Sequence, residues 1–373
     1  MSETATYWVG TYPAAGFGTP VGQGEGIWRI RLAPDGRPVD ALLAAVTPAP
    51  SFLARHPRRP VLYAANEIAP TGRISGWAIG AGGRLDPLGM LSSGGAEPCH
   101  LLVDPAGRAL YVCNYGSGSV ATVLLEPDGG FDRTALESGE PTSVLGHHGT
   151  GAEPARQEGP HAHFAALAPS GRWVLVVDLG TDELRRYRVA TDGRLVADGI
   201  AARLPAATGP RHLAFGPADA LYVVGELDVT VQVLRWDDAS GTAIPVQVLP
   251  ACATGLRSGH RVLPAHLVVA DRRLVLSVRG ADVVAEFEVA DDGGLRYSTE
   301  LDSAGAWPRH FALEDDRMIV ANQTGGGVVV LARDQARPDA AAAAAGSGGP
   351  GMPVVLGRLD LPSPACVIAE PSA

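Results

Sequence analysis

The chain has 373 residues, a hydrophobic fraction of 46% and a formal net charge of −10. This apolar content supports a packed core and excludes a wholly disordered chain. No run rich in lysine and arginine points to a nucleic-acid-binding face, and no apolar stretch approaches the roughly 20 residues of a membrane helix. The 47 glycines and 30 prolines are spread along the chain, which is typical of many short strands separated by tight turns.

The N-terminus and the cysteines bear on the compartment. Residues 1–4 lack the basic and apolar regions of a secretory signal, and strand-like sequence follows at once. None of the cysteines forms a C-x-x-C pair, so a zinc site is not indicated; they are Cys99, Cys113, Cys252 and Cys366. We therefore expect a cytoplasmic protein with reduced thiols, no metal and no cofactor.

A short module recurs along the chain. It consists of an apolar strand, a turn that contains proline in most copies, and a second strand of the Leu-Tyr-Val type that ends in a polar residue. In four copies the polar residue lies 14 positions after a Phe or His of the first strand (52 to 66, 100 to 114, 164 to 178 and 212 to 226). The polar residues of the six complete copies are Asn66, Asn114, Asp178, Glu226, Arg279 and the pair Asn322 and Gln323.

A seventh copy is split between the two ends of the chain. Residues 363–368 match the first strand, and residues 7–12 match the second. Asp-Gly turns at 35–36, 192–193 and 292–293 indicate further hairpins, so each module holds about four strands in ~40–50 residues. The sequence predicts an all-β, seven-bladed β-propeller with four-stranded antiparallel blades, in which one blade is closed by both termini and the ring has no exposed sheet edge.

We expect a single domain over residues 1–373, interrupted by two stretches. Residues 140–160 are predicted to form an inserted loop near the site, because they immediately precede His163. Residues 335–352 contain an alanine run followed by Gly-Ser-Gly-Gly, which indicates a low-complexity loop.

Equivalent positions of propeller blades form rings around a central channel. The predicted first ring comes from the starts of the first strands and contains Ser51, Cys99, His163, Arg211, Ala265 and Arg309. The second ring contains the polar residues that end the second strands. Charged side chains at inward-facing positions must be paired or functional, so we expect the chemistry at these rings.

The chain resembles the lactonase family of seven-bladed propellers, which includes 6-phosphogluconolactonases and the fungal carboxy-muconate cyclase. The segments that carry the resemblance span nearly the whole chain: residues 9–12, 24–27, 50–53, 113–120, 178–182, 209–212 and 307–310. The resemblance implies hydrolysis of a sugar-lactone ester. From the cyclase branch, which is proposed to use one His, two Arg and one Glu, it implies a catalytic set of His163, Arg211, Glu226 and Arg279.

We therefore expect a small anionic lactone as the substrate, plausibly 6-phosphogluconolactone. Arg211, Arg279 and Arg309 would bind the phosphate and polarise the ester carbonyl, while either Glu226 or His163 activates water. Further expected substrate contacts are Arg309, Asn114, Ser51, Asn66, Asp178 and Gln323. Asn66 and Asn114 either tie loops or bind substrate hydroxyls, and Asp178 can hold a turn.

Four recurring histidines are predicted to be structural, through packing or strand-to-strand hydrogen bonds; they are His100, His212, His266 and His310. Two alternatives to the hydrolase stay open. The first is a lactonizing cyclase that acts on a dicarboxylate, and the second is a non-catalytic binding or scaffold propeller. We expect neither a nucleic-acid nor a membrane partner, and a monomer or weak homodimer.

Overall fold

The computed structural model describes residues 4–12, 26–255, 261–333 and 350–371. Within these ranges the strands form seven four-stranded sheets and group into two compact units. Most of the predicted low-complexity loop lies outside the described residues.

Unit 1 comprises residues 1–46, 216–234 and 246–373, and contains three complete sheets. In hydrogen-bonded order, the first is β28 (Pro364–Ala369), β1 (Ala5–Thr11), β2 (Gly26–Leu32) and β3 (Pro38–Val46). The second is β20 (Leu263–Ala270), β21 (Arg273–Arg279), β22 (Val283–Val289) and β23 (Leu295–Asp302). The third is β24 (Ala306–Leu313), β25 (Arg317–Gly325), β26 (Gly327–Ala332) and β27 (Val355–Leu359).

Unit 2 comprises residues 47–215 and 235–245, and also contains three complete sheets. The first is β4 (Pro50–Arg55), β5 (Val61–Asn66), β6 (Arg73–Ile79) and β7 (Leu85–Ser92). The second is β8 (Pro98–Val103), β9 (Ala109–Asn114), β10 (Ser119–Leu124) and β11 (Ser143–Gly146). The third is β12 (Ala162–Leu167), β13 (Trp173–Asp178), β14 (Glu183–Val189) and β15 (Leu195–Arg203).

The remaining sheet has strands in the ranges of both units. It consists of β16 (Pro210–Phe215), β17 (Ala220–Gly225), β18 (Thr230–Asp237) and β19 (Thr242–Pro250). In each of the other six sheets neighbouring strands run antiparallel. A helix, α1 (Arg133–Ser138), and a short 3-10 turn, η1 (Ala81–Gly83), are the helical elements of the described ranges.

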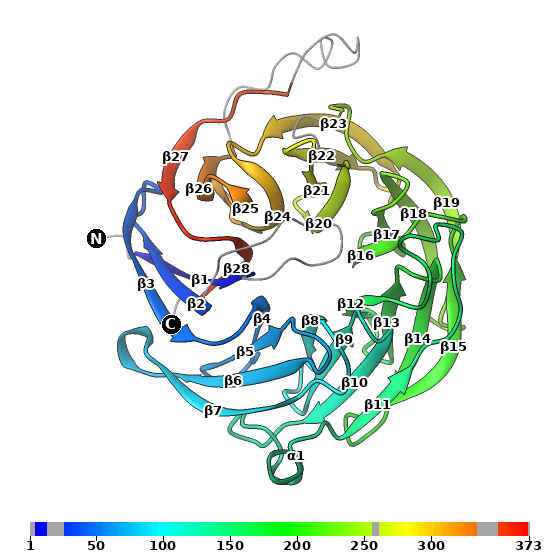
Figure 1. Cartoon of the computed structure of the whole chain (residues 1–373). Helices are drawn as coiled ribbons and strands as arrows, with labels where there is room; N and C mark the ends of the chain where they lie inside the picture. Colours follow the sequence, from blue (N-terminus) through cyan, green and yellow to red (C-terminus); the bar gives the residue numbers. More distant parts are fainter. Residues whose placement is uncertain (1–3, 13–25, 256–260, 334–349, 372–373) are drawn as a thin grey trace. The chain divides into compact units, whose positions relative to one another are not determined.

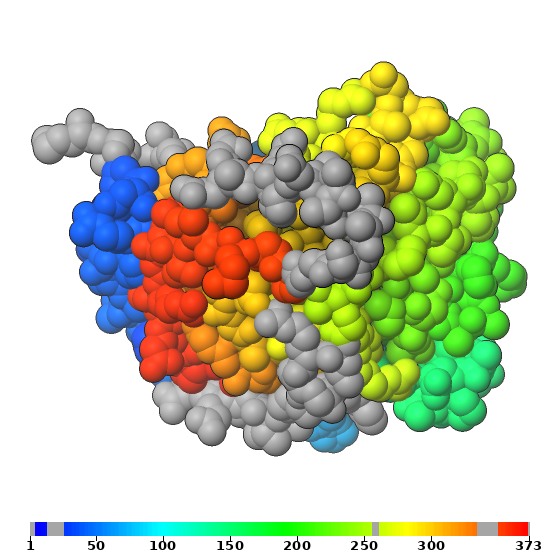
Figure 2. Space-filling view, turned by 90° about the horizontal axis from the view of Figure 1, so that it is seen from above, coloured from blue at the N-terminus to red at the C-terminus, as the bar shows by residue number. Residues whose placement is uncertain are grey.

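Both ends of the chain contribute to one sheet, as predicted. β1 pairs with β28 in antiparallel register, with Tyr7 opposite Ala369 and Val9 opposite Val367, and the two strands lie together in Figure 1. Figure 2 shows the red C-terminal segment beside the blue N-terminal strands. Pairing inside one sheet gives each terminal strand hydrogen-bond partners that it would otherwise lack.

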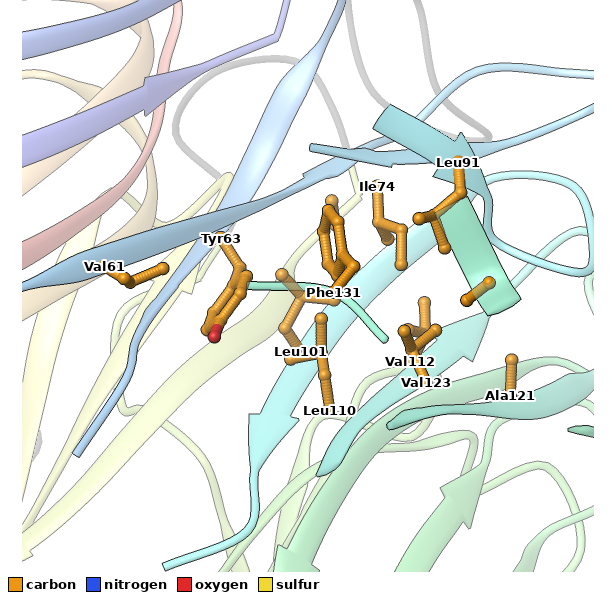
Figure 3. Packing of buried hydrophobic residues seen from close by; sticks show 12 residues of the cluster. Val61, Tyr63, Ile74, Leu91, Leu101, Leu110, Val112, Ala121, Val123 and Phe131 are labelled. Carbon is orange, nitrogen blue, oxygen red and sulfur yellow. The ribbon is translucent and has the colours of Figure 1, made fainter. Parts of the chain in front are cut away.

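The second strand of each module is buried on both faces. β5, β9 and β13 are buried at every residue, because each carries a continuous apolar run instead of an alternating pattern. Figure 3 shows the resulting core between β5, β6, β9 and β10, where Tyr63 packs beside Phe131. Outer strands such as β19 alternate between exposed and partly buried residues along much of their length, as strands with one solvated face do.

The tyrosine of the Leu-Tyr-Val strands ties neighbouring modules together. The Tyr63 hydroxyl donates to the Gly129 carbonyl at 2.5 Å, and the Tyr111 hydroxyl donates to Gly193 at 2.8 Å. In unit 1, Tyr222 makes the same bond to a hairpin glycine, at 2.8 Å from the Gly293 carbonyl. The repeat therefore encodes a recurring hydrogen bond as well as strands.

The recurring histidines make packing contacts and hydrogen bonds of the predicted kind. Nδ1 of His100 accepts the Ala165 amide at 3.2 Å, and Nδ1 of His310 accepts the Val367 amide at 3.5 Å. The His266 and His310 rings stack with centroids 3.8 Å apart, and His212 packs on Phe164 with centroids 4.3 Å apart. These rings connect first strands of successive sheets.

The inserted stretch 140–160 differs from the predicted loop in one part. Residues 143–146 form β11, the fourth strand of their sheet, and pair with Ser119 to Thr122 of β10. The segment was hard to recognise as a strand because it has four residues and follows α1. Outside β11, the stretch is irregular and runs towards the start of β12.

Candidate active site

Five predicted first-ring residues lie at a β-bulge or a similar shift in strand register. Pro50 is opposite Asn66 and Phe52 is opposite Ala65, which leaves Ser51 as the extra residue. The same shift isolates Cys99 in β8, His163 in β12 and Arg309 in β24, and a wider irregularity includes Ala265 in β20. Bulges redirect a side chain and are common beside active sites. The backbone conformation therefore supports these positions as candidates for the site.

The residue before the first strand adopts a left-handed conformation in several modules. Its φ is +42° at Ala49, +52° at Glu97 and +44° at Ser363, a region that costs a non-glycine residue roughly 1 kcal/mol or more. The carbonyl of this residue accepts the amide that follows the polar end of the second strand, as in Tyr115 to Glu97 at 2.9 Å. This bond holds the ends of the two strands together.

In unit 2, the bulge residue His163 contacts Arg211. Nη1 of Arg211 donates to Nε2 of His163, and both residues are about 5% exposed or less. Because a guanidinium group offers only donors, Nε2 must carry the lone pair and the ring proton lies on Nδ1. The pair is therefore a neutral imidazole against a buried cation.

In unit 1, Glu226 and Arg279 form a buried ion pair. Nη2 of Arg279 lies 2.6 Å from Oε2 of Glu226, and both side chains are 2% exposed. Nε of Arg279 also donates to the Leu263 carbonyl at 3.1 Å, and the guanidinium carbon lies 5.5 Å from the Trp307 ring centroid. Such contacts offset the cost of desolvating the two charges.

Arg309 and Gln323 also meet in unit 1. Nη1 of Arg309 donates to Oε1 of Gln323 at 3.5 Å, and the guanidinium carbon lies 4.9 Å from the Tyr12 ring centroid. The structure thus brings together two predicted substrate-binding residues, with an aromatic face that favours a cation.

The other predicted substrate contacts lie at strand ends and are engaged with loops. Nδ2 of Asn66 donates to the Pro48 carbonyl at 2.6 Å, and Nδ2 of Asn114 donates to Ser93 at 2.9 Å. Both asparagines are fully buried, and Ser51 is 3% exposed. Through these bonds both asparagines tie loops, which was one of the two roles predicted for them. Substrate binding by Asn66, Asn114 and Ser51 stays a prediction.

Asp178 organises the chain before His163. Its Oδ1 accepts the amides of His161, Gly180 and Thr181 at 2.8 to 3.2 Å, and Oδ2 lies 2.6 Å from Nδ1 of His147. Burial raises the pKa of the Asp178 carboxyl, but the bonds from His147 and the His161 amide, with the charges nearby, bring that pKa below its ordinary value. Asp178 holds a turn, as predicted; its role in substrate binding is untested.

Several residues beside His163 were missed by the sequence prediction. The Tyr115 ring stacks on His161 with centroids 4.3 Å apart and meets His163 edge-on at 5.6 Å. From the inserted stretch, Nη2 of Arg156 donates to the Tyr115 hydroxyl at 3.3 Å, and Gln157 anchors the segment by donating to the Leu179 carbonyl at 2.9 Å. The one sequence signal was the His-Ala-His run at residues 161–163.

Two negative findings apply to the described part of the chain. No group of three or more His, Cys, Asp or Glu side chains there could hold a metal ion. No helix in the same residues is both long and apolar enough to cross a membrane.

Comparison with known proteins gives three consistent matches. The family described as lactonase, 7-bladed beta-propeller, matches residues 6–345. A 6-phosphogluconolactonase of Bacillus subtilis (strain 168) is 30% identical over 334 residues, which cover 88% of this chain and 91% of that protein. The periplasmic gluconolactonase PpgL of Pseudomonas aeruginosa is 26% identical, with a TM-score of 0.82 over 98% of this chain and 99% of that chain.

A further solved structure supports the fold alone. A protein from Lactobacillus plantarum is 24% identical, with a TM-score of 0.80 over 99% of this chain and all of that chain. The predicted seven-bladed propeller with four-stranded blades is confirmed. The chain belongs to the lactonase family of seven-bladed β-propellers.

Proposed function

We propose that the protein is a lactone hydrolase of the 6-phosphogluconolactonase type, which opens the ring ester of a small anionic sugar lactone in cytoplasmic carbohydrate metabolism. The family assignment and the Bacillus subtilis relative support this reaction class. The observation that carries the proposal is the buried contact between Arg211 and the neutral His163 ring, both on first strands or their bulges.

In this proposal Arg211 polarises the ester carbonyl. A guanidinium group offers a planar set of donors to an oxyanion, and a buried, preoriented donor stabilises the charge that develops on the carbonyl oxygen. His163 orients Arg211 without cancelling its charge, because the imidazole accepts a hydrogen bond in its neutral form.

The remaining predicted residues bind the substrate in this proposal. Arg309, held by Gln323 and Tyr12, binds the anionic group of the lactone, since charge-assisted bonds to phosphate or carboxylate are strong. The charge-balanced pair of Glu226 and Arg279 orients the polar groups of the sugar.

The test follows acid release after lactones are added to the purified protein. Wild-type protein is expected to accelerate opening of 6-phosphogluconolactone above the spontaneous rate, and to act more slowly on glucono-δ-lactone. Arg211→Ala should lower kcat by roughly 10²- to 10³-fold. Arg133→Ala is the matched control, because Arg133 is 86% exposed on α1. Failure of wild-type protein to accelerate any lactone would overturn the proposal.

The same buried arginines could instead clamp the carboxylates of a substrate that cyclises. Adding an unsaturated dicarboxylate to the assay distinguishes the two reactions, because cyclisation consumes the acid and forms the lactone. Inactivity in both directions, together with tight binding of a protein partner, would favour a scaffold.

A further inference from the structure

Lactone hydrolysis needs a group that takes a proton from the attacking water. The sequence offers His163 and Glu226 for this role. In the structure Nε2 of His163 accepts a bond from Arg211, so protonation there would set a second positive charge against the guanidinium. Oε2 of Glu226 is held by Arg279 at 2.6 Å. Both candidates are therefore engaged with an arginine.

His161, two residues before His163, has the geometry of a general base. Its Nδ1 lies 2.9 Å from the Tyr115 carbonyl oxygen. A carbonyl can only accept, so the ring proton is on Nδ1 and Nε2 carries the lone pair. The His161 amide donates to Asp178 at 2.8 Å, and the ring stacks on Tyr115 at an interplanar angle of 13°. The backbone and the ring plane are thus both held.

Two carboxylates lie near the ring of His161. Oε1 of Glu158 lies 3.5 Å from Nε2 of His161; the Glu158 side chain is 56% exposed and the His161 side chain 7%. Burial and the charge of Glu67 raise the pKa of the Glu97 carboxyl, and His161 lowers it, so Glu97 is close enough to interact with the imidazole. Carboxylates near an imidazolium stabilise it.

Tyr115 connects His161 to the proposed carbonyl-binding pair. One ring stacks on His161 and meets His163 edge-on, with centroid distances of 4.3 and 5.6 Å. His161 lies two residues before the bulge residue His163, which contacts Arg211, and all three residues are in unit 2. A chain of side-chain contacts through Tyr115 and His163 therefore links His161 to Arg211.

We propose that His161 is the general base of the hydrolysis, an inference that rests on the proposed function. Nε2 of His161 takes a proton from water as the water oxygen bonds to the carbonyl carbon, and Arg211 stabilises the carbonyl oxygen. The ring C–O bond then breaks, and the leaving alkoxide takes the proton back from the imidazolium. The hydroxy acid formed loses its own proton to solvent, so atoms and charge balance.

The test compares His161→Asn with wild-type protein in the acid-release assay. The asparagine amide can still donate to the Tyr115 carbonyl, whereas the base at Nε2 is lost. We expect kcat to fall by roughly 10²- to 10⁴-fold while KM changes little. In His161→Ala, added imidazole should restore part of kcat in a concentration-dependent manner, which a structural role would not produce.

His148→Asn is the matched control, because His148 is exposed in the same inserted stretch and should keep the wild-type rate. His163→Asn should raise KM or lower kcat without rescue by imidazole. Full activity of His161→Asn, or lost activity without rescue and with a lower melting temperature, would overturn the assignment of His161. If wild-type protein opens no lactone, the proposed function itself fails, and that outcome is seen before any variant is made.

Discussion

The two buried arginine pairs differ in what faces the guanidinium group. In unit 2, Arg211 donates to a neutral imidazole, so the pair as a whole is positively charged. In unit 1, Arg279 meets the Glu226 carboxylate and two backbone carbonyls, so the pair is neutral. The same residue type therefore has a neutral partner in one place and an anionic partner in the other.

The largest effect is expected when the ion pair of Glu226 and Arg279 is broken. Glu226→Ala leaves Arg279 buried without its carboxylate, and loss of one member of a buried ion pair costs about 3–5 kcal/mol. Urea unfolding should show this loss as a lower midpoint. Glu226→Gln keeps a hydrogen-bond acceptor and should lose less. Equal stability of Glu226→Ala and wild type would mean that the ion pair does not contribute to the free energy of unfolding.

A change in the pair of Arg211 and His163 should lower activity more than stability. Arg211→Lys keeps the positive charge and loses the planar fork, so kcat is expected to fall by about 10²-fold, with a small shift in melting temperature. Steady-state kinetics and thermal unfolding on the same preparation separate the two effects. A variant with normal kcat but low stability would reverse the contrast between the pairs.

A smaller effect is expected when one tyrosine hydroxyl is removed from the core of each unit. Tyr63→Phe and Tyr222→Phe each remove one hydroxyl that donates to a hairpin glycine, and each should cost about 1 kcal/mol. Similar losses in chemical unfolding would show that the repeat contributes equally in both units. A loss in only one variant would break that equivalence.

The smallest effect concerns another neutral histidine, His56, which lies away from the site. Its Nδ1 accepts the Arg59 amide at 3.0 Å, and burial lowers its pKa. The unfolded chain therefore binds a proton more readily, so this contribution to stability is complete above about pH 6.5 and is lost as the pH falls towards the folded-state pKa. His56→Gln should flatten the decline of melting temperature over that acid range. An unchanged slope would contradict the assignment.

Repetition made the fold predictable. Matching residues 363–368 and 7–12 to the two halves of one module was enough to predict that β28 pairs with β1. The Asp-Gly turns and the apolar runs predicted β2, β3 and the buried second strands. The strand β11 was missed, because four residues after a helix carry too little periodicity to identify a strand.

The candidate site was predictable only as a set of positions. Strand starts and strand ends located His163, Arg211, Glu226 and Arg279, but the pairing of these residues follows from contacts across 48 and 53 positions of the chain. No local pattern contains that information. The stacking of His161 on Tyr115, across 46 positions of the chain, likewise depends on the tertiary structure.

The sequence by itself determined the repeat, the four-stranded modules and the joining of the two ends, because these depend on local periodicity and on turn chemistry that recurs in every copy. The tertiary structure decided which residue of each first strand bulges, which arginine faces a neutral ring and which faces a carboxylate, and which imidazole nitrogen carries the lone pair. Those properties depend on register and on partners brought together from distant segments, and a hydrogen-bond donor has no assigned acceptor until the chain has folded.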